Sequence, residues 1–292
     1  MRSAVLMIVI SMAAACSDAP PTASRKATTR AAAAAPVDIP AAPDQPINAL
    51  EKNTKALPGD LDAVIGRGYL RILVAPSRAY FETVDGRHHG LAVDAGVELA
   101  KTLTEDAKRE IAPVFIETRE DQLLPSLLAG KGDVAANVLL TITRDEQFAF
   151  APPVKTGIRE LVVTDVGKPM VSLEDVGGRT IYVRKNSDHH LSLIRLNEQL
   201  AKNHRRLAVI IPDEKTRTDE DLLDSVNAGR IRATIVDDYI FDRWQGEFTK
   251  LAKTNRDIAV SQDGVVAWVT RKDAPALTAL LKDFFSTHKL TF

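Results

Sequence analysis

Short apolar runs and helical patterns alternate along most of this chain, and this alternation constrains the fold more than any other feature. Residues 69–75 and 111–117 are runs typical of buried strands, whereas residues 91–103 and 121–129 carry apolar side chains at helical spacing. Alternating strands and helices indicate a mainly parallel sheet that helices cover on both faces. We therefore expect an α/β fold over this part of the chain.

The same alternation starts again after a long extended run at residues 159–166. A second extended run at residues 264–270 leads into a final amphipathic helix at 274–286. Two α/β units joined by two extended segments predict two lobes with a ligand cleft between them. The expected boundaries are residues 58–160 plus 266–292 for lobe 1 and residues 161–265 for lobe 2.

The composition is that of a soluble globular chain. Its 292 residues are 45% hydrophobic and 26% charged with a net charge of −1, which suits two compact lobes. Aromatic residues make up only 5% and no basic run occurs, so we expect no nucleic-acid partner. The single cysteine excludes a disulfide within this chain, and the adjacent histidine pairs do not form a metal-ligand pattern. No cofactor or metal is therefore expected.

The chain opens with an apolar run at residues 4–15 that is too short to span a bilayer and ends directly at Cys16. The run Met12-Ala-Ala-Ala-Cys16 resembles the lipobox of bacterial lipoproteins, in which the cysteine is lipidated and becomes the mature N-terminus. This resemblance implies a signal peptide at residues 1–15 and a membrane anchor at Cys16. Because Ser17 and not aspartate follows the cysteine, the outer membrane is favoured. The alternative is an ordinary secretory signal that leaves a free thiol.

The segment that follows, residues 16–57, is rich in Ala and Pro and has no apolar periodicity. Such a composition cannot bury enough apolar surface to fold. We interpret it as a disordered tether between a lipid anchor and the folded lobes, which places the protein in the periplasm, attached to the cell envelope.

A candidate binding residue occurs in residues 140–152, which predict a buried strand, a turn and a short helix. Thr143 and Glu146 fit a capping box for this helix, and Arg144 lies in its first turn. A cation at a helix N-terminus is disfavoured by roughly 0.3–1 kcal/mol, so Arg144 needs another partner. A guanidinium binds a carboxylate with two parallel hydrogen bonds, which favours an anion in the cleft. The alternative is a surface arginine paired with Asp145 or Glu146.

Five segments occur in the order found in the bacterial type 3 solute-binding proteins, which close two lobes around amino acids and similar solutes. The segments are residues 69–74, 90–94, 132–152, 173–183 and 229–237. The chain resembles this family from about residue 59 to residue 292. The resemblance implies a two-lobed periplasmic-binding-protein type II fold with a central cleft and two segments that cross the hinge.

The same resemblance implies a set of ligand-binding residues. Arg144 would bind the carboxylate of the ligand and Asp237 its amine. The remaining positions implied are Tyr80, Phe81, Thr141, Asn186 and Ser187. Core packing is the alternative for the two aromatic residues, and a helix cap is the alternative for Asn186 and Ser187.

One departure from the family bears on the ligand. Many amino-acid binders carry serine or threonine where this chain has Ala136 and Leu139, although Thr141 keeps a hydroxyl nearby. The loss of these donors favours a larger or less polar solute over a standard free amino acid. A cell-wall peptide fragment is one such solute.

The last third of the chain resembles the non-catalytic module of membrane-bound lytic transglycosylase F at residues 221–229, 233–237, 265–268 and 277–285. In that family the module precedes a catalytic domain with a glutamate that is usually followed by serine. The sequence printed here contains no Glu-Ser dipeptide, so we expect a binding module and not an enzyme.

The expected function is the binding of a small zwitterionic or anionic ligand, an amino acid, peptide or muropeptide fragment, for transport or for sensing and regulating cell-wall turnover. An ABC-transporter permease or a cell-wall enzyme are the expected protein partners. The alternative is a divergent transglycosylase F-like protein that acts on peptidoglycan.

Overall fold

The computed structural model describes residues 55–140, 146–167, 170–215, 218–254 and 258–288. The chain divides into two units between residues 35 and 36, and the fold below belongs to the second unit. The expected signal peptide, Cys16 and almost all of the expected tether lie outside the described residues and stay predictions. Within the described residues, no helix has the length and apolar character needed to cross a membrane.

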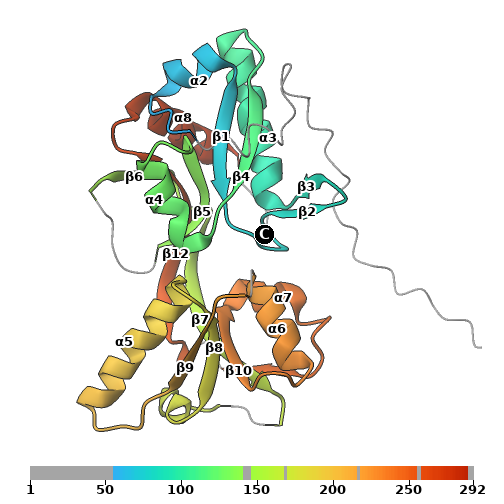
Figure 1. Cartoon of the computed structure of the whole chain (residues 1–292), viewed down its shortest axis with the longest axis vertical. Helices are drawn as coiled ribbons and strands as arrows, with labels where there is room; N and C mark the ends of the chain where they lie inside the picture. Colours follow the sequence, from blue (N-terminus) through green and yellow to red (C-terminus); the bar gives the residue numbers. More distant parts are fainter. Residues whose placement is uncertain (1–54, 141–145, 168–169, 216–217, 255–257, 289–292) are drawn as a thin grey trace, which may run out of the picture. The chain divides into compact units, whose positions relative to one another are not determined.

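Lobe 1 is built on three parallel strands, with β1 between β4 and β5. Its strands are β1 (Tyr69–Val74), β2 (Glu82–Val84), β3 (Arg87–His89), β4 (Ala112–Glu117), β5 (Val134–Leu140) and β6 (Phe148–Phe150). Its helices are α2 (Leu61–Arg67), α3 (Leu91–Ala107), the 3₁₀ helix η1 (Glu120–Gln122), α4 (Leu123–Leu128) and α8 (Pro275–Thr287). Figure 1 shows these elements as one group, in which the late helix α8 contacts β6 and the crossing strand near it, residues 261–271.

Lobe 2 repeats this arrangement, with β8 lying between the parallel strands β10 and β9. Its strands are β8 (Thr180–Arg184), β9 (Val209–Asp213), β10 (Ala233–Asp237) and β11 (Leu251–Lys253). Its helices are the 3₁₀ helix η2 (Leu173–Val176), α5 (Asp188–Lys202), α6 (Asp219–Asn227) and α7 (Asp238–Trp244). One apolar cluster of this lobe includes Ile181 and Leu193, whereas buried residues of α6 and α7, such as Leu223 and Ile240, belong to the larger cluster that also contains the lobe 1 core.

Two long antiparallel strands connect the lobes (Figure 1). β12 (Ser261–Arg271) pairs with β5 and β6 of lobe 1, and β7 (Lys155–Asp165) pairs with β10 and β11 of lobe 2. Because β7 and β12 also pair with each other, ten of the described strands form one sheet that continues through both lobes, while β2 and β3 form a separate two-stranded sheet. The α/β, two-lobed fold class with two crossing segments is confirmed.

One predicted helix is shorter than expected. The sequence pattern predicts a helix over residues 121–129, whereas the structure has the 3₁₀ helix η1 followed by α4 from Leu123. Pro125 lacks a backbone N–H, so it fits only within the first turn of an α-helix. This proline explains why the α-helix begins only two residues before it.

Gly90 positions the loop that carries Tyr80. Its φ is 119°, and a Cβ built on it would lie 2.3 Å from the carbonyl oxygen of Tyr80. The close approach lets the first backbone N–H groups of α3, from Leu91 and Ala92, donate to the carbonyls of Ala79 and Tyr80 at 3.1 and 3.0 Å. Helix α3 thereby holds this loop in place, because these donors have no partner within the helix.

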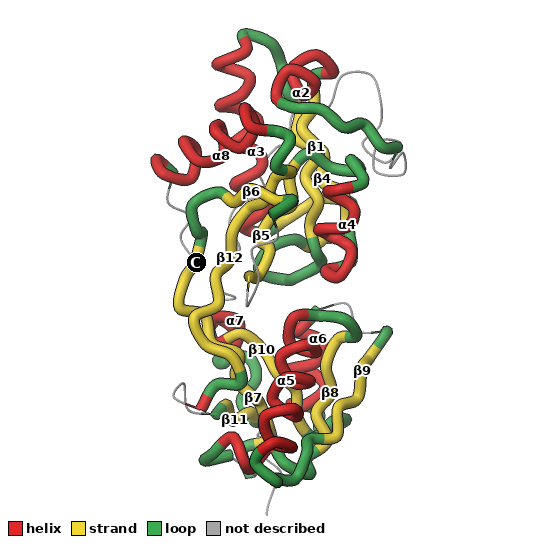
Figure 2. The backbone as a smooth tube through the Cα atoms, turned by 90° about the vertical axis from the view of Figure 1, so that its left-hand side faces the viewer, coloured by secondary structure: helices red, strands yellow, loops and turns green. Residues whose placement is uncertain are grey.

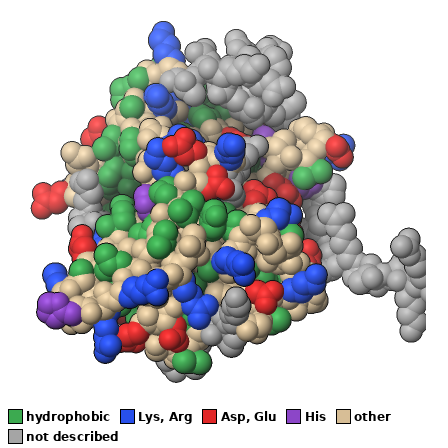
Figure 3. Space-filling view, turned by 60° about the horizontal axis from the view of Figure 1, so that its bottom comes forward, with side chains coloured by type: hydrophobic (Ala, Val, Ile, Leu, Met, Phe, Trp, Pro, Cys, Tyr) green, Lys and Arg blue, Asp and Glu red, His purple; other side chains and the backbone are tan. Residues whose placement is uncertain are grey.

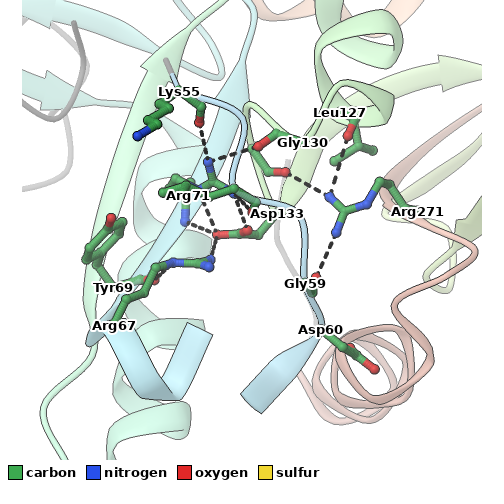
Figure 4. Close-up of polar contacts among 12 residues, drawn as sticks. Lys55, Gly59, Asp60, Arg67, Tyr69, Arg71, Leu127, Gly130, Asp133 and Arg271 are labelled. Carbon is green, nitrogen blue, oxygen red and sulfur yellow. Dashed lines mark hydrogen bonds and ion pairs between the residues drawn. The ribbon is translucent and has the colours of Figure 1, made fainter. Parts of the chain in front are cut away.

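A buried ionic cluster holds the start of the described chain against lobe 1 (Figure 4). Asp133 is fully buried and accepts hydrogen bonds from the backbone N and the guanidinium Nη2 of Arg71, both at 2.8 Å, and from Arg67. Arg71 also donates to the carbonyl of Leu57 at 2.8 Å, and Arg271 donates to that of Gly59 at 2.7 Å. Asp133, in the family-like segment, therefore has a structural role here.

Candidate functional site

A cavity of about 310 Å³ lies between the lobes, and residues of both lobes line it. Figure 2 shows α5 and α6 with one end of each facing lobe 1. These ends carry Asp188 and His189 of α5 and Asp219 and Glu220 of α6 to the cavity, while lobe 1 contributes Tyr80 among others. The cavity is therefore built by segments that are distant in the sequence.

Asp237, the last residue of β10, lines this cavity and is 6% exposed. Its Oδ1 lies 3.1 Å from Nε2 of the buried His189, whose Nδ1 lies 3.6 Å from Oδ1 of Asp219. Burial opposes a charge on His189, but the two carboxylates raise its pKa well above the usual value. Burial also raises the pKa of Asp237. The residue expected to bind a ligand amine thus already has an internal cationic partner.

Arg184, at the end of β8, connects the two lobes. Its guanidinium binds Asp219 with two hydrogen bonds of 2.8 and 3.0 Å and reaches across the cleft to Glu120 of lobe 1 at 2.6 Å. Burial disfavours the charged form of Asp219, but Arg184 and His189 together lower its pKa well below the usual range. Asp219 is therefore an ionised structural anchor of the cleft.

Other contacts between the lobes surround this ion pair. The Ser77 hydroxyl donates to Glu220 at 3.2 Å, and the Asn186 amide donates to Asp121 at 3.2 Å. At the outer edge Arg78 pairs with Asp221 at 3.0 Å. We call these three contacts and the Arg184–Glu120 pair the cross-cleft contacts, because they join the two lobes directly.

The lining of the cavity is strongly acidic. Six carboxylates line it, from Glu120, Asp121, Asp188, Asp219, Glu220 and Asp237, whereas its cations among the described residues are Arg184 and His189. By contrast, Figure 3 shows Lys, Arg, Asp and Glu side chains interspersed on the face of the molecule that it presents. The cleft therefore has a local excess of acidic side chains, although the net charge of the whole chain is only −1.

Besides Asp237, three further acids in and behind the cavity have raised pKa values. Burial, followed by the charge of Glu120, raises the pKa of Asp188 to about 7. Burial raises the pKa of Glu160 to about 7; Glu160 lies on β7 directly opposite Asp237 and is 1% exposed. Burial likewise raises the pKa of Glu220. These groups resist ionisation because burial takes their charges out of water.

The two aromatic residues expected at the site lie in different places. Tyr80 lines the cavity, and its ring meets that of Tyr239 edge-on at 6.1 Å between centroids. Phe81 is 1% exposed and packs against Phe115 and His88 at 6.0 and 5.0 Å. Phe81 is not among the residues that line the cavity, so its contacts are those of the lobe 1 core.

Asn186 and Ser187 also differ from each other. Asn186 lines the cavity with a left-handed backbone at φ 60°. Ser187 is buried and caps α5: its hydroxyl accepts from the backbone N of His190 at 3.3 Å and donates to the carbonyl of Arg184 at 2.8 Å. The contacts of Ser187 are those of the helix-cap alternative. Arg144 and Thr141 lie outside the described residues.

Sequence reasoning did not identify most of the ionisable residues in the cleft. The sequence contains Ser187-Asp188-His189 and an acidic run at residues 219–221. Adjacency along the chain, however, does not indicate which side chains meet in space. The informative signal was acidic residues at the starts of two helices, each of which follows a strand of lobe 2. Within the described part of the chain, no group of three or more His, Cys, Asp or Glu side chains is placed to hold a metal ion.

Two α/β lobes joined by two strands, with a polar cavity between them, define a two-lobed binding protein. The sequence profile of the bacterial extracellular solute-binding proteins, family 3, matches residues 70–290. The chain belongs to this family. The family is described as one of extracellular proteins that bind solutes.

Among curated proteins, the chain is similar to the membrane-bound lytic murein transglycosylase F of Nitrosospira multiformis, with 28% identity over 167 residues. The match covers 57% of this chain and 32% of that protein, so this chain spans about a third of the length of its relative.

Among solved structures, it is similar to AbpA of Streptococcus pneumoniae bound to L-arginine, an amino acid ABC transporter substrate-binding protein. The identity is 20% and the TM-score 0.59, over 77% of this chain and 90% of that chain. Holo ArgBP from T. maritima has 19% identity and a TM-score of 0.58 over 77% and 92%. At this identity the likeness shows the fold alone.

Proposed function

We propose that this protein binds a small zwitterionic solute in the cavity between its lobes, and that the lobes close on the bound solute. The observation that carries the proposal is the position of Asp237: it ends β10 at a cavity that both lobes line, where its carboxylate can accept a ligand amine. A ligand that contacts both lobes stabilises the closed state, because it makes more contacts in that state than in the open one.

The acidic lining narrows the expected ligand. An anionic solute would meet six lining carboxylates, and two cations that already have carboxylate partners. A zwitterion brings its own cation to this surface, and its carboxylate is proposed to bind Arg144. Free amino acids, peptide termini and muropeptide fragments all provide this pair of groups.

The cellular role that we propose is that of a lipid-anchored binding protein in the periplasm, with Cys16 as the lipidated residue. The lipobox resemblance and membership of an extracellular solute-binding family support this placement. Delivery to an ABC-transporter permease and the sensing of cell-wall fragments are both compatible with a closing cleft. The similarity to the transglycosylase supports the second role and a cell-wall enzyme as its partner.

Ligand-dependent thermal stabilisation tests the binding function. We expect a zwitterionic amino acid or muropeptide to raise the melting temperature of the wild-type protein. Asp237→Asn and Arg144→Ala should each weaken binding by about tenfold or more, because each removes a hydrogen bond between charged groups. The matched controls Asp106→Asn and Arg205→Ala, at exposed positions, should leave it unchanged.

Two outcomes would contradict the proposal. If no amino acid, peptide or muropeptide stabilises the protein, or if stabilisation persists undiminished in both site variants, the cavity is not the binding site. The alternative function, direct action on peptidoglycan, is tested by a zymogram on purified cell wall. Lysis by this chain alone would establish the alternative and overturn a role limited to binding.

A further inference from the structure

The carboxylates that line the cavity fall into two groups by their partners. Asp219 and Asp237 are neutralised by Arg184 and His189, and Glu120 pairs with Arg184 across the cleft. Asp121 pairs with Arg119 at 2.5 Å. The cations of the cavity are therefore already used by these carboxylates.

The second group consists of Glu220, which accepts a hydrogen bond from the Ser77 hydroxyl, and Asp188. Asp188 is the first residue of α5, it is half-buried, and it lines the cavity. Among the described residues, no cationic side chain forms an ion pair with it. The charged groups that act on it are Glu120 from lobe 1, Glu160 from β7, Asp237 from β10 and its neighbour His189.

A ligand group placed beside Asp188 would experience mainly negative potential. Near a protein surface, a unit charge about 4 Å away interacts with several kcal/mol, which is enough to select the sign of the ligand charge. A carboxylate is repelled there, a neutral group leaves Asp188 without a partner, and a cation gains an ion pair.

We propose that Asp188 is a specificity-determining residue that pairs with a cationic side group of the ligand, an ammonium or a guanidinium, in addition to the ligand's α-amine. This inference rests on the proposed function and names the class of ligand taken by the same cavity. Two sources supply this chemistry: a free basic amino acid, and a cell-wall peptide that contains a diamino acid.

Pairs of ligands that differ in charge but little in shape test the proposal by isothermal titration calorimetry. L-arginine is compared with L-citrulline, and L-lysine with L-norleucine. A tripeptide that ends in diaminopimelate is compared with the same peptide acylated on its side-chain amine. The measurements are made at pH 8, where Asp188 is mostly ionised, and at low salt, because screening weakens exposed charge pairs.

We expect the wild-type protein to bind the cationic member of at least one pair about tenfold or more tightly than the neutral member. In Asp188→Asn this preference should fall to about threefold or less, whereas affinity for the neutral member stays the same. Asp188→Glu should retain the preference, and the exposed control Asp106→Asn should behave as the wild type does.

The outcomes separate this inference from the proposed function. If the neutral members bind as tightly as the cationic ones, the inference is wrong and the binding function stands. If no ligand in the set binds, the proposed function is wrong and the inference with it. If Asp188→Asn fails to fold, two results still decide whether the inference holds: the preference of the wild-type protein for the cationic ligand, and its retention in Asp188→Glu. Preference within the peptide pair alone identifies the cell wall as the source.

Discussion

Removal of the Asp133 carboxylate is expected to destabilise the protein by about 3–5 kcal/mol, the range for removing one partner of a buried ion pair. Asp133 is fully buried and is the anionic partner of Arg67 and Arg71, and Arg71 itself is 4% exposed. In Asp133→Ala the Arg71 guanidinium keeps its carbonyl acceptors at Gly130 and Leu57 but remains buried without an anion. Asp133→Asn keeps one acceptor oxygen and should cost about half as much.

Equilibrium unfolding in guanidinium chloride, followed by tryptophan fluorescence, measures this change. Trp268 lies in the core of lobe 1 and is fully buried, so its emission reports the loss of this lobe. For a folded unit of this size, a loss of 3–5 kcal/mol moves the midpoint by about 1 M guanidinium chloride. The exposed control Asp106→Ala should change the free energy of unfolding by no more than about 0.5 kcal/mol.

A loss below about 1 kcal/mol in Asp133→Ala would refute this reasoning, because the two arginines would then need no buried anion. Ligand affinity provides a second check. Asp133 does not line the cavity between the lobes, so the folded variant should bind ligand as tightly as the wild-type protein does. Weakened binding at a temperature where the variant is fully folded would show that the cluster also shapes the cleft.

Three further predictions concern the cleft and its supports. Burial raises the folded pKa of Glu160 from 4.5 to about 7. Between these pH values the unfolded chain has lost this proton while the folded state still holds it, so the free energy of unfolding should fall by on the order of 3 kcal/mol as the pH rises. Glu160→Gln should remove this contribution in unfolding curves at pH 5 and pH 8, and an unchanged pH dependence would contradict it. Glu120→Gln removes a cross-cleft charge from Arg184 and should weaken the closed state by about 1 kcal/mol. The radius of gyration of the ligand-free protein, measured by X-ray scattering, should then increase; no increase would show that other contacts hold the lobes. Gly90→Ala forces a Cβ against the Tyr80 carbonyl and should cost about 1–3 kcal/mol in thermal unfolding, whereas an unaltered melting temperature would rule out this constraint.

The sequence predicts the framework of the fold well, because hydrophobic periodicity is a local property. The run at residues 69–75 contains β1, that at 111–117 contains β4, and the extended runs at 159–166 and 264–270 coincide largely with the crossing strands β7 and β12. The helix predicted at residues 91–103 is the first part of α3, which continues to Ala107.

The candidate site was predicted less completely. Asp237 and Tyr80, inferred from the family resemblance, both line the cavity, whereas Phe81 packs in the lobe 1 core. The positions of Arg144 and Thr141 stay predictions, because both lie outside the described residues. The sequence assigns no role to His189 beyond its place in a histidine pair without a metal-ligand pattern, and the structure places it between two carboxylates.

The sequence by itself determined the α/β class, the two-lobed family and the segments that cross between the lobes, because these follow from local periodicity and ordered motifs. Only the tertiary structure decided the charge of the cleft. Its six carboxylates come from η1 and from the ends of three other elements, and the described cations that line the cavity with them are Arg184 and His189. Electrostatic energy depends on distances in space, which spacing along the chain does not encode.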